Sequence, residues 1–363
     1  MNLQDLKSAK VGLVDTPLAT LEHLGEHLSK GPIYIKRDDL TGLAFGGNKA
    51  RKLDYLVQYA LDHHYTTLMT FGGVQSNHAR MTAAAAAAKG LKSILVLMGP
   101  KPQTCSGNLI LDRMMDCELV FVDTSAFAGQ KDQKEKTKAY LDRCVKQIVE
   151  EKEKAGEKVL NIPIGGQGVI GSAGYIKAVP EIMRQMQEQN ISAKYLVCGY
   201  GSTGTFAGLV AGALAYKALF EIIGIPVQPD YHPQAECAAF VNQLSEYYDL
   251  GFTCTPDMIR VEPGLPEDPY YGLGYDIPDE KTQETMRLMA SLEGIFVDPC
   301  YTGKVLRGMC DLIKRGVIEE NAGVIFLHSG GTPAIWSSEH LDFAQTVLWN
   351  DDHNIQVFKA EAV

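Results

Sequence analysis

Two kinds of hydrophobic pattern alternate along the chain. Short, nearly continuous apolar runs predict strands at residues 33–36, 67–70, 93–98, 119–122, 159–162, 195–198, 222–227, 295–297 and 324–327. Between them, apolar residues recur at helical spacing and predict helices at 50–61, 77–89, 173–187, 206–218, 280–292 and 304–314. Continuous apolar strands are typical of sheets buried on both faces, and strand–helix alternation indicates parallel strands. We therefore expect an α/β fold with helices on both sides of a parallel sheet.

Two segments differ from this alternation. Residues 130–157 carry dense charge of both signs, with apolar residues at helical spacing between 140 and 148. They predict an amphipathic helix with a solvated face. Residues 164–168 read Ile-Gly-Gly-Gln-Gly, and their glycines interrupt the chain between two blocks of strands and helices. A change of domain is expected near this point.

Composition and charge exclude several classes of partner. The chain has 363 residues with 34 Lys and Arg against 44 Asp and Glu, a net charge of -10. Nucleic acids and anionic membranes require clustered Lys and Arg, so neither is expected to bind. Eight scattered cysteines without a C-x-x-C pair predict neither a disulfide framework nor a structural metal site. No run reaches the roughly 18 apolar residues of a membrane span, and the polar start lacks a signal core, so we expect a cytoplasmic protein.

Five glycine-rich or polar turns follow expected strands, where ligands of open parallel sheets bind. The first contains Gly46, Gly47, Asn48 and Lys49. Asn48 is a good helix N-cap, and Lys49 then lies in the first helical turn, where the helix dipole disfavours an ammonium group. A neutral lysine amine is the form that condenses with an aldehyde. An exposed helix start with solvated lysines remains an alternative.

The second turn reads Gly-Gly-Val-Gln-Ser-Asn-His from residue 72 to 78. Ser76 or Asn77 is expected to cap the Ala-rich helix that follows, and such a helix start binds a carboxylate or phosphate. An ordinary cap without a ligand is the alternative. His78 fits a packing role as well as a catalytic one.

The third turn, Gly-Tyr-Gly-Ser-Thr-Gly-Thr at residues 199–205, combines backbone donors with hydroxyl groups, as phosphate-binding loops do. It also matches G-x-G-x-x-G through Gly199, Gly201 and Gly204, with Glu221 downstream as a possible ribose-binding acid. However, Glu221 precedes the next expected strand, whereas that fingerprint requires the acid at the end of the strand. A dinucleotide site is therefore the weaker interpretation.

The fourth segment contains Tyr275 and Tyr301, and the fifth contains Ser329. Tyrosines at turns can donate or accept protons, although most tyrosines only pack. Thr302 is expected to cap the following helix. The segment His-Ser-Gly-Gly-Thr-Pro at 328–333 could approach a flat ring closely or simply turn the chain. Neither a G-x-S-x-G elbow nor a P-loop motif is present.

Taken in order, the five segments resemble the D-cysteine desulfhydrase and 1-aminocyclopropane-1-carboxylate deaminase family of fold-type II pyridoxal-phosphate enzymes. G-G-N-K-x-R-K-L followed by Q-S-N-H-x-R carries the resemblance, which runs from about residue 16 to 334. It implies a tryptophan-synthase-β-like fold with two open, parallel-rich twisted sheets flanked by helices. Residues 1–52 and 164–363 would form a large cofactor-binding domain, and 53–163 a small substrate-side domain. It also implies pyridoxal 5'-phosphate as cofactor, held by Lys49 as a Schiff base, and a homodimer.

The resemblance assigns roles to matching positions. Those implied as catalytic are Lys49, Ser76, Tyr275 and Tyr301. Those implied to bind the cofactor are Lys49, Asn77, Gly201, Ser202, Thr203, Gly204, Thr205, Thr302 and Ser329. Those implied to bind the substrate are Gln75, Ser76, Asn77, His78 and Tyr275.

One position favours a particular reaction within the family. The deaminase has an acid directly after its second tyrosine, which keeps the pyridine nitrogen protonated, whereas this chain has Thr302. A hydroxyl supplies no such charge, so α,β-elimination of a good leaving group is expected, foremost conversion of D-cysteine to pyruvate, sulfide and ammonia. The Cα proton would pass to Lys49 or a tyrosine, preferably Tyr301. The deaminase reaction, an L-cysteate sulfo-lyase, a nucleotide-dependent oxidoreductase and a non-catalytic cofactor-binding protein remain alternatives.

Overall fold

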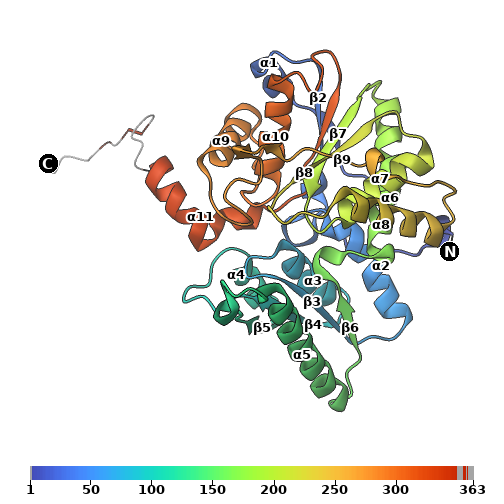
Figure 1. The fold of residues 1–363 in the computed structure, drawn as a ribbon, viewed down its shortest axis with the longest axis vertical. Coiled ribbons are helices and arrows are strands. Elements are labelled where there is room, and N and C mark those ends of the chain that lie inside the picture. The colour runs from blue at the N-terminus through green and yellow to red at the C-terminus, as the bar shows by residue number, and fades with distance from the viewer. Residues whose placement is uncertain (1, 350–354, 357, 359–363) are drawn as a thin grey trace.

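The computed structural model describes residues 2–349, 355–356 and 358, which form two open sheets with their flanking helices (Figure 1). The six-stranded sheet has the order β1-β2-β12-β7-β8-β9. Only β1 is antiparallel to its neighbour. Its strands are β1 (Leu18–Thr20), β2 (Ile33–Lys36), β12 (Val324–Leu327), β7 (Tyr195–Tyr200), β8 (Glu221–Pro226) and β9 (Arg260–Val261).

The four-stranded sheet is entirely parallel, in the order β5-β4-β3-β6. Its strands are β3 (Thr67–Gly73), β4 (Lys92–Met98), β5 (Glu118–Val122) and β6 (Val159–Ile162). A small antiparallel pair, β10 (Gly264–Leu265) and β11 (Asp268–Pro269), lies in the loop before Tyr275. The expected pair of parallel-rich sheets is confirmed.

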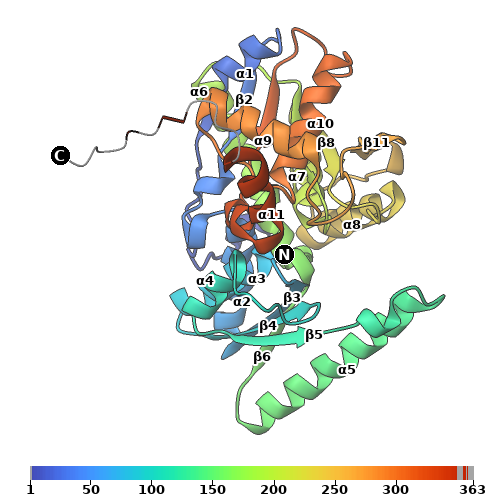
Figure 2. The same ribbon diagram turned by 90° about the vertical axis from the view of Figure 1, so that its left-hand side faces the viewer.

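Helices cover both faces of each sheet, because side chains of successive strand residues point to opposite faces. In β4, Ile94 and Val96 pack toward α5, whereas Leu95 and Leu97 pack toward α3 and α4. Figure 2 shows α5 as the outer layer of this sheet. On the larger sheet, one core cluster joins α6, α7 and α8, and the other joins α1, α9 and α10. The helices are α1 (Glu22–His27), α2 (Lys49–Asp62), α3 (Asn77–Ala88), α4 (Asn108–Met114), α5 (Gln133–Lys154), α6 (Val169–Glu188), α7 (Gly204–Tyr216), α8 (Gln234–Tyr248), α9 (Glu280–Glu293), α10 (Thr302–Lys314) and α11 (Ser338–Phe343).

The strand predicted at 295–297 is wrong. These residues form no strand and lie between α9 and the turn that follows Asp298. Both edges of β12, whose end they approach through His328, are already paired with β2 and β7. Phe296 is 62% exposed, and its carbonyl lies 3.0 Å from His328 Nε2. The apolar pattern therefore reflects only local burial of Val297.

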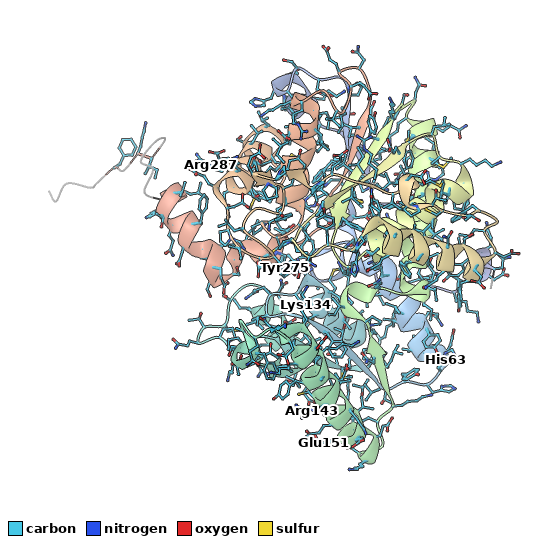
Figure 3. All side chains as sticks on the ribbon, in the orientation of Figure 1. His63, Lys134, Arg143, Glu151, Tyr275 and Arg287 are labelled. Carbon is cyan, nitrogen blue, oxygen red and sulfur yellow. The ribbon has the colours of Figure 1, made fainter. Side chains whose placement is uncertain are left out.

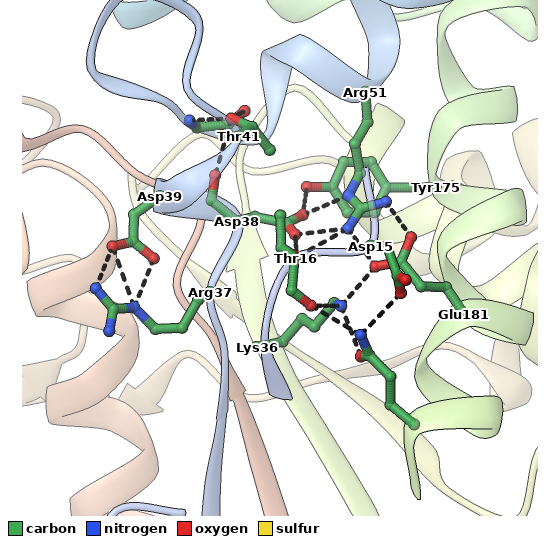
Figure 4. A network of polar contacts seen from close by, with 12 residues as sticks. Asp15, Thr16, Lys36, Arg37, Asp38, Asp39, Thr41, Arg51, Tyr175 and Glu181 are labelled. Carbon is green, nitrogen blue, oxygen red and sulfur yellow. Dashed lines mark hydrogen bonds and ion pairs between the residues drawn. The ribbon is translucent and has the colours of Figure 1, made fainter. Parts of the chain in front are cut away.

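A buried ionic network fixes the start of α2 (Figure 4). Arg51 donates to both carboxylate oxygens of Asp38 at 2.8 Å and also contacts Glu181 of α6. Burial alone would raise the pKa of Asp38, but the ion pair with Arg51 and the hydroxyl of Tyr175 outweigh it and hold that pKa below its usual range. Lys36 joins the network through Glu181. Because Arg51 lies two residues after Lys49, the network also sets the position of Lys49.

No helix in the described part of the chain is both long and apolar enough to span a bilayer.

Candidate active site

The turns singled out in the sequence converge on one cavity of about 510 Å³. It lies beyond the carboxyl ends of strands β3 and β7, where the two sheets face each other, and Figure 3 places Tyr275 at this junction. Predicted site residues that line it are Lys49, Ser76, His78, Gly201, Ser202, Thr203, Thr205, Tyr275, Tyr301 and Ser329. Asn77 lines a small adjoining cavity together with Lys49 and Tyr301. Gln75, Gly204 and Thr302 are absent from the lining of both cavities.

Lys49 is the first residue of α2, as expected, and is buried. Burial lowers the pKa of its amine to about 8, the positive charge of Arg80 acts in the same direction, and Asp298 opposes them. Desolvation is the largest of these causes. Asn48 occupies the N-cap position of α2, as predicted, but its side chain makes no cap bond. Instead, Asn48 accepts from Lys49 Nζ at 2.9 Å and donates to Thr205 Oγ1 at 2.9 Å, so it ties the amine to the loop before α7.

The loop 201–205 and the start of α7 form an anion-binding cradle. Thr203 adopts a left-handed backbone (φ 63°), and its buried Oγ1 has no hydrogen-bond partner among the described residues. Lys52 lies behind the loop, where its buried Nζ donates to the carbonyl of Gly165 at 3.0 Å. A Cβ on Gly204 would come within 3.0 Å of that ammonium, so only glycine leaves room there.

The cradle fits the phosphate of the expected cofactor. Lys52 has no carboxylate partner among the residues that the structure describes, and burial together with Lys49 holds its pKa well below the usual value. A buried cation without a counter-ion is costly, and a phosphate at a helix N-terminus would offset that cost. Sequence reasoning missed Lys52. Its only signal was its place three residues after Lys49, on the same face of a helix.

Ser76 and Asn77 begin α3 on the other side of the cavity. Ser76 caps the helix, since its Oγ accepts from the backbone N–H of Ala79 at 3.1 Å, which confirms one of the two predicted caps. The side-chain oxygen of Asn77 accepts from Asn108 Nδ2 at 3.0 Å. The start of this 12-residue helix therefore faces the cavity with its positive dipole end.

Gln75 and His78 point in different directions from this helix start. Gln75 is turned toward the neighbouring loop, where it accepts from the N–H of Asn108 at 2.9 Å and donates to the carbonyl of Ser106. His78 lines the cavity, and its Nε2 lies 2.8 Å from Thr70 Oγ1. Because Thr70 donates its own proton to a backbone carbonyl, it must accept from Nε2–H. Burial, with Lys49 and Lys52 nearby, holds the pKa of His78 well below its usual value, so the ring is neutral.

Tyr275 and Tyr301 form a hydroxyl pair at the cavity wall. Their oxygens lie 2.8 Å apart, and their rings meet edge to face with centroids 5.6 Å apart. Lys49 Nζ lies 5.8 Å from the centre of the Tyr301 ring. Burial raises the pKa of both phenols above the usual value, so both hold their protons. This favours proton donation by Tyr301 over the proton abstraction expected from the sequence.

Thr302 does not cap α10 as predicted, because the helix begins at Thr302 itself. The N-cap residue is Tyr301, without a side-chain cap bond, and the backbone N–H groups at the helix start are bound instead by Asp298, which is fully buried. Its carboxylate accepts from the backbone N–H groups of Cys300, Tyr301 and Thr302 at 3.1, 3.0 and 2.7 Å. The Thr302 hydroxyl lies 2.6 Å from the same carboxylate. Asp298 thus positions Tyr301, a role that sequence reasoning missed because the residue looked like an ordinary turn acid.

Ser329 joins two glycine turns across the cavity floor. Its carbonyl accepts from the N–H of Asn48 at 2.9 Å. A Cβ on Gly330, which has a φ of 85°, would come within 2.6 Å of the Gly47 backbone. This close approach of two backbones explains the paired glycines in both segments.

The dinucleotide interpretation is wrong. Glu221 is the first residue of β8 and pairs in register with Tyr195, at the strand ends far from the loop 201–205. Its carboxylate forms an ion pair with Arg260 at 2.8 Å. Glu221 therefore lies at the opposite end of β8 from the place that the fingerprint requires for the acid.

Comparisons with known proteins agree with this site. The family model described as "Pyridoxal-phosphate dependent enzyme" matches residues 10–330. D-cysteine desulfhydrases of Salmonella newport and Salmonella typhimurium are 34% identical over 327 residues, which cover 89% of this chain and 93% of theirs. A crystal structure of an ACC deaminase homologue superimposes with a TM-score of 0.80 at 30% identity, over 96% of this chain and 97% of that one. A hydrogen sulfide-producing enzyme from Fusobacterium nucleatum, 17% identical with a TM-score of 0.58, covers 92% of this chain and 98% of its own and shares the fold. The chain therefore belongs to the pyridoxal-phosphate dependent enzymes, in the family of D-cysteine desulfhydrase and ACC deaminase homologues.

Proposed function

We propose that this enzyme catalyses α,β-elimination on a small β-substituted amino acid, with D-cysteine as its substrate. The reaction is D-cysteine plus water giving pyruvate, hydrogen sulfide and ammonia, in which the Cα–H, Cβ–S and Cα–N bonds break and water supplies the keto oxygen. The observation that carries the proposal is the placement of Lys49, with its lowered pKa, between a protonated tyrosine pair and the start of α3. The relatives named D-cysteine desulfhydrase support this choice of substrate.

Different residues of the cavity would bind the substrate carboxylate and the cofactor. The substrate carboxylate would bind at the start of α3, where Ser76, Asn77 and the helix dipole favour an anion. Pyridoxal phosphate, held by Lys49 and by the cradle at Ser202, Thr203 and Thr205, supplies the electron sink that stabilises negative charge at Cα. The site has the buried cations and hydroxyl groups to hold its phosphate.

Two proton transfers follow from the protonation states of the side chains. Lys49 Nζ, as a neutral amine, would accept the Cα proton, since its pKa of about 8 lies near neutral pH. The hydroxyl pair of Tyr275 and Tyr301 would deliver a proton to the departing sulfur, because burial keeps both phenols protonated. The hydroxyl of Thr302 lies 2.6 Å from the carboxylate of Asp298. We propose that Thr302 is a neutral neighbour of the pyridine nitrogen and does not set its charge.

The decisive experiment assays release of pyruvate (or 2-oxobutyrate from the cyclopropane substrate) and ammonia from D-cysteine, L-cysteine, L-cysteate and 1-aminocyclopropane-1-carboxylate side by side. We expect turnover of D-cysteine to exceed the others and Lys49→Ala to abolish it. Lys177→Ala, a lysine of α6 over the Tyr55 ring, serves as the control and should leave turnover unchanged. Preference for 1-aminocyclopropane-1-carboxylate or L-cysteate would make the enzyme a deaminase or a sulfo-lyase. A yellow protein that turns over none of the four would contradict the proposal and indicate a non-catalytic binder.

We also propose a cytoplasmic homodimer, with domains at 1–52 plus 164–363 and at 53–163. Each of the two larger sheets falls wholly within one of these domains. Large exposed apolar side chains, including Leu273, Ile277 and Phe296, support burial against a second copy. Sedimentation analysis of the holoenzyme measures the oligomeric state, and a monomer at micromolar concentration would contradict the dimer.

A further inference from the structure

Three side chains of metal-ligand type meet behind the tyrosine pair. Cys300 Sγ lies 2.6 Å from Asp276 Oδ1, and His340 Nε2 lies 3.1 Å from the same oxygen. The three donor atoms all lie within 4.8 Å of one another. Cys300 and His340 are 2% and 3% exposed. They come from three separate segments, namely the loop before α9, the turn before α10, and α11.

We propose that Asp276, Cys300 and His340 form a binding site for one divalent transition-metal ion, of which zinc fits best. A thiolate, an imidazole and a carboxylate are the three ligand types that zinc takes in proteins. With three protein ligands, a fourth position stays open for water. Nothing in the D-cysteine reaction requires this ion, so the site stands apart from the proposed function.

The backbone of Asp276 is one that glycine would also adopt. Asp276 has a φ of 57°, a left-handed conformation that glycine adopts at no cost. Aspartate tolerates this region better than most residues, and Asp116 and Asp249 have it too. A glycine at position 276 would therefore keep the backbone of this loop while removing the carboxylate.

No cation contacts the cluster directly in the described part of the chain: Asp276 has no Lys or Arg partner there, and its contacts are Cys300 and His340. The buried ammonium of Lys304 donates to the carbonyls of Tyr271 and Gly274, and its charge acts on Cys300 and Asp276 from nearby. Within the described residues, the other ring nitrogen of His340 has no partner, so the polar contact of this buried ring is the cluster.

Metal binding requires a small movement. Ligand atoms about 2.0–2.3 Å from a tetrahedral ion stand roughly 3.4–3.7 Å apart. The distance from Cys300 Sγ to Asp276 Oδ1 must therefore open by about 1 Å. Both residues adjoin the hydroxyl pair, because Asp276 follows Tyr275 and Cys300 precedes Tyr301. An ion here would tie both tyrosine segments to the C-terminal helix α11.

The test measures zinc bound to the holoenzyme by equilibrium dialysis and metal analysis, in buffer free of thiols and amino acids. We expect one equivalent of zinc per chain in the wild type, and a higher melting temperature with zinc than with EDTA. Asp276→Gly removes a ligand while keeping the backbone of the loop, so this variant should fold and lose both effects. Cys300→Ser should lose them as well.

Cys310→Ser is the matched control, because Cys310 is a buried free cysteine of α10 outside the cluster. It should bind zinc like the wild type. Absence of bound zinc in the wild type, or zinc that is retained by both Asp276→Gly and Cys300→Ser, would overturn the site. Pyruvate release from D-cysteine with EDTA present tests the proposed function separately, so the two can fail independently.

Discussion

At the scale of single residues, the pKa of Lys49 makes cofactor capture depend on pH. Capture needs the neutral amine, and burial lowers the pKa of Lys49 from 10.5 to about 8. Below that pKa the neutral fraction falls tenfold for each pH unit, to roughly one tenth at pH 7. We predict that covalent uptake of pyridoxal phosphate by the apoenzyme accelerates about tenfold per pH unit up to about pH 7.5 and levels off above pH 8.

The measurement follows the absorbance change on mixing apoenzyme with pyridoxal phosphate in stopped flow. A cofactor analogue without the aldehyde, 4'-deoxypyridoxine phosphate, is the control, since its binding should lack this steep dependence. A rate that keeps rising tenfold per unit to pH 10 would show that the amine has an ordinary pKa.

The hydroxyl of Tyr301 gives a second prediction at this scale. Tyr301→Phe keeps the ring beside Lys49 but removes the oxygen that lies 2.8 Å from the hydroxyl of Tyr275. We expect kcat for D-cysteine to fall by about 10²-fold or more, the usual share of a positioned proton donor, with KM changed little. Tyr140→Phe on the surface helix α5 is the control. A normal kcat in Tyr301→Phe would exclude proton delivery by the pair.

The sequence predicted most side chains that line the cavity, but not the buried charges behind them. Lys49, Ser76 and Tyr301 lie in recognisable sequence motifs, so they could be identified from the sequence. Lys52 and Asp298 appear in the sequence as ordinary polar residues, and only the folded chain shows that both are buried. Burial of a charged group depends on which distant segments cover it, and local pattern carries no such information.

At the scale of elements, Asp298 joins the start of α10 to the site. Its carboxylate accepts three backbone N–H groups, and its negative charge raises the pKa of Lys49. Asp298→Asn removes the charge and replaces one acceptor with an N–H donor. We predict a loss of about 2 kcal/mol in the free energy of unfolding and a lower pKa for Lys49, so cofactor capture should level off below pH 8.

Chemical denaturation and the pH dependence of capture check these two effects. Asp279→Asn is the control, because Asp279 caps α9 through the N–H of Thr282 and does not act on the pKa of Lys49. An unchanged capture profile in Asp298→Asn would show that its charge does not reach the amine.

Element prediction succeeded where pairing partners were available. The strands at 33–36, 159–162 and 324–327 have the predicted bounds, because each β-rich run enters a sheet between or beside parallel neighbours. The apolar run at 295–297 forms no strand, and β12, whose end it approaches through the contact between Phe296 and His328, is already paired on both edges.

Helices α4, α8 and α11 were not predicted. In α8 the buried residues, among them Cys237, Val241, Leu244 and Tyr248, recur at helical spacing, so the signal was present in the sequence. Helices α4 and α11 have only seven and six residues, which is too short for a periodic pattern to stand out.

At the scale of the whole molecule, hydrogen bonds join the loop at residues 106–107, which follows β4, to residues 336–338. We call these hydrogen bonds the latch. The N–H of Gly107 donates to the carbonyl of Trp336 at 3.0 Å, and Ser106 Oγ lies 2.8 Å from Ser338 Oγ and accepts from the Ser338 N–H. Gln75 holds the same loop through Ser106, one residue before Ser76 of the cavity. The latch therefore links the approach of the two sheets to the proposed substrate site.

Gly107→Ala tests this link. Gly107 has a φ of 54°, and a Cβ there would lie 2.5 Å from Gln75 Oε1 and 3.2 Å from the backbone of Ser337, so the Gln75 side chain must shift beside the latch. Gly129 also has a positive φ (75°), but a Cβ there meets no neighbouring atom within 4 Å. We predict faster hydrogen exchange over residues 101–108 and a higher KM for D-cysteine in Gly107→Ala, because Gln75 and Ser76 lose their fixed neighbour. Gly129→Ala should show neither change. Equal KM values in the two variants would mean that substrate binding does not depend on closure between the sheets.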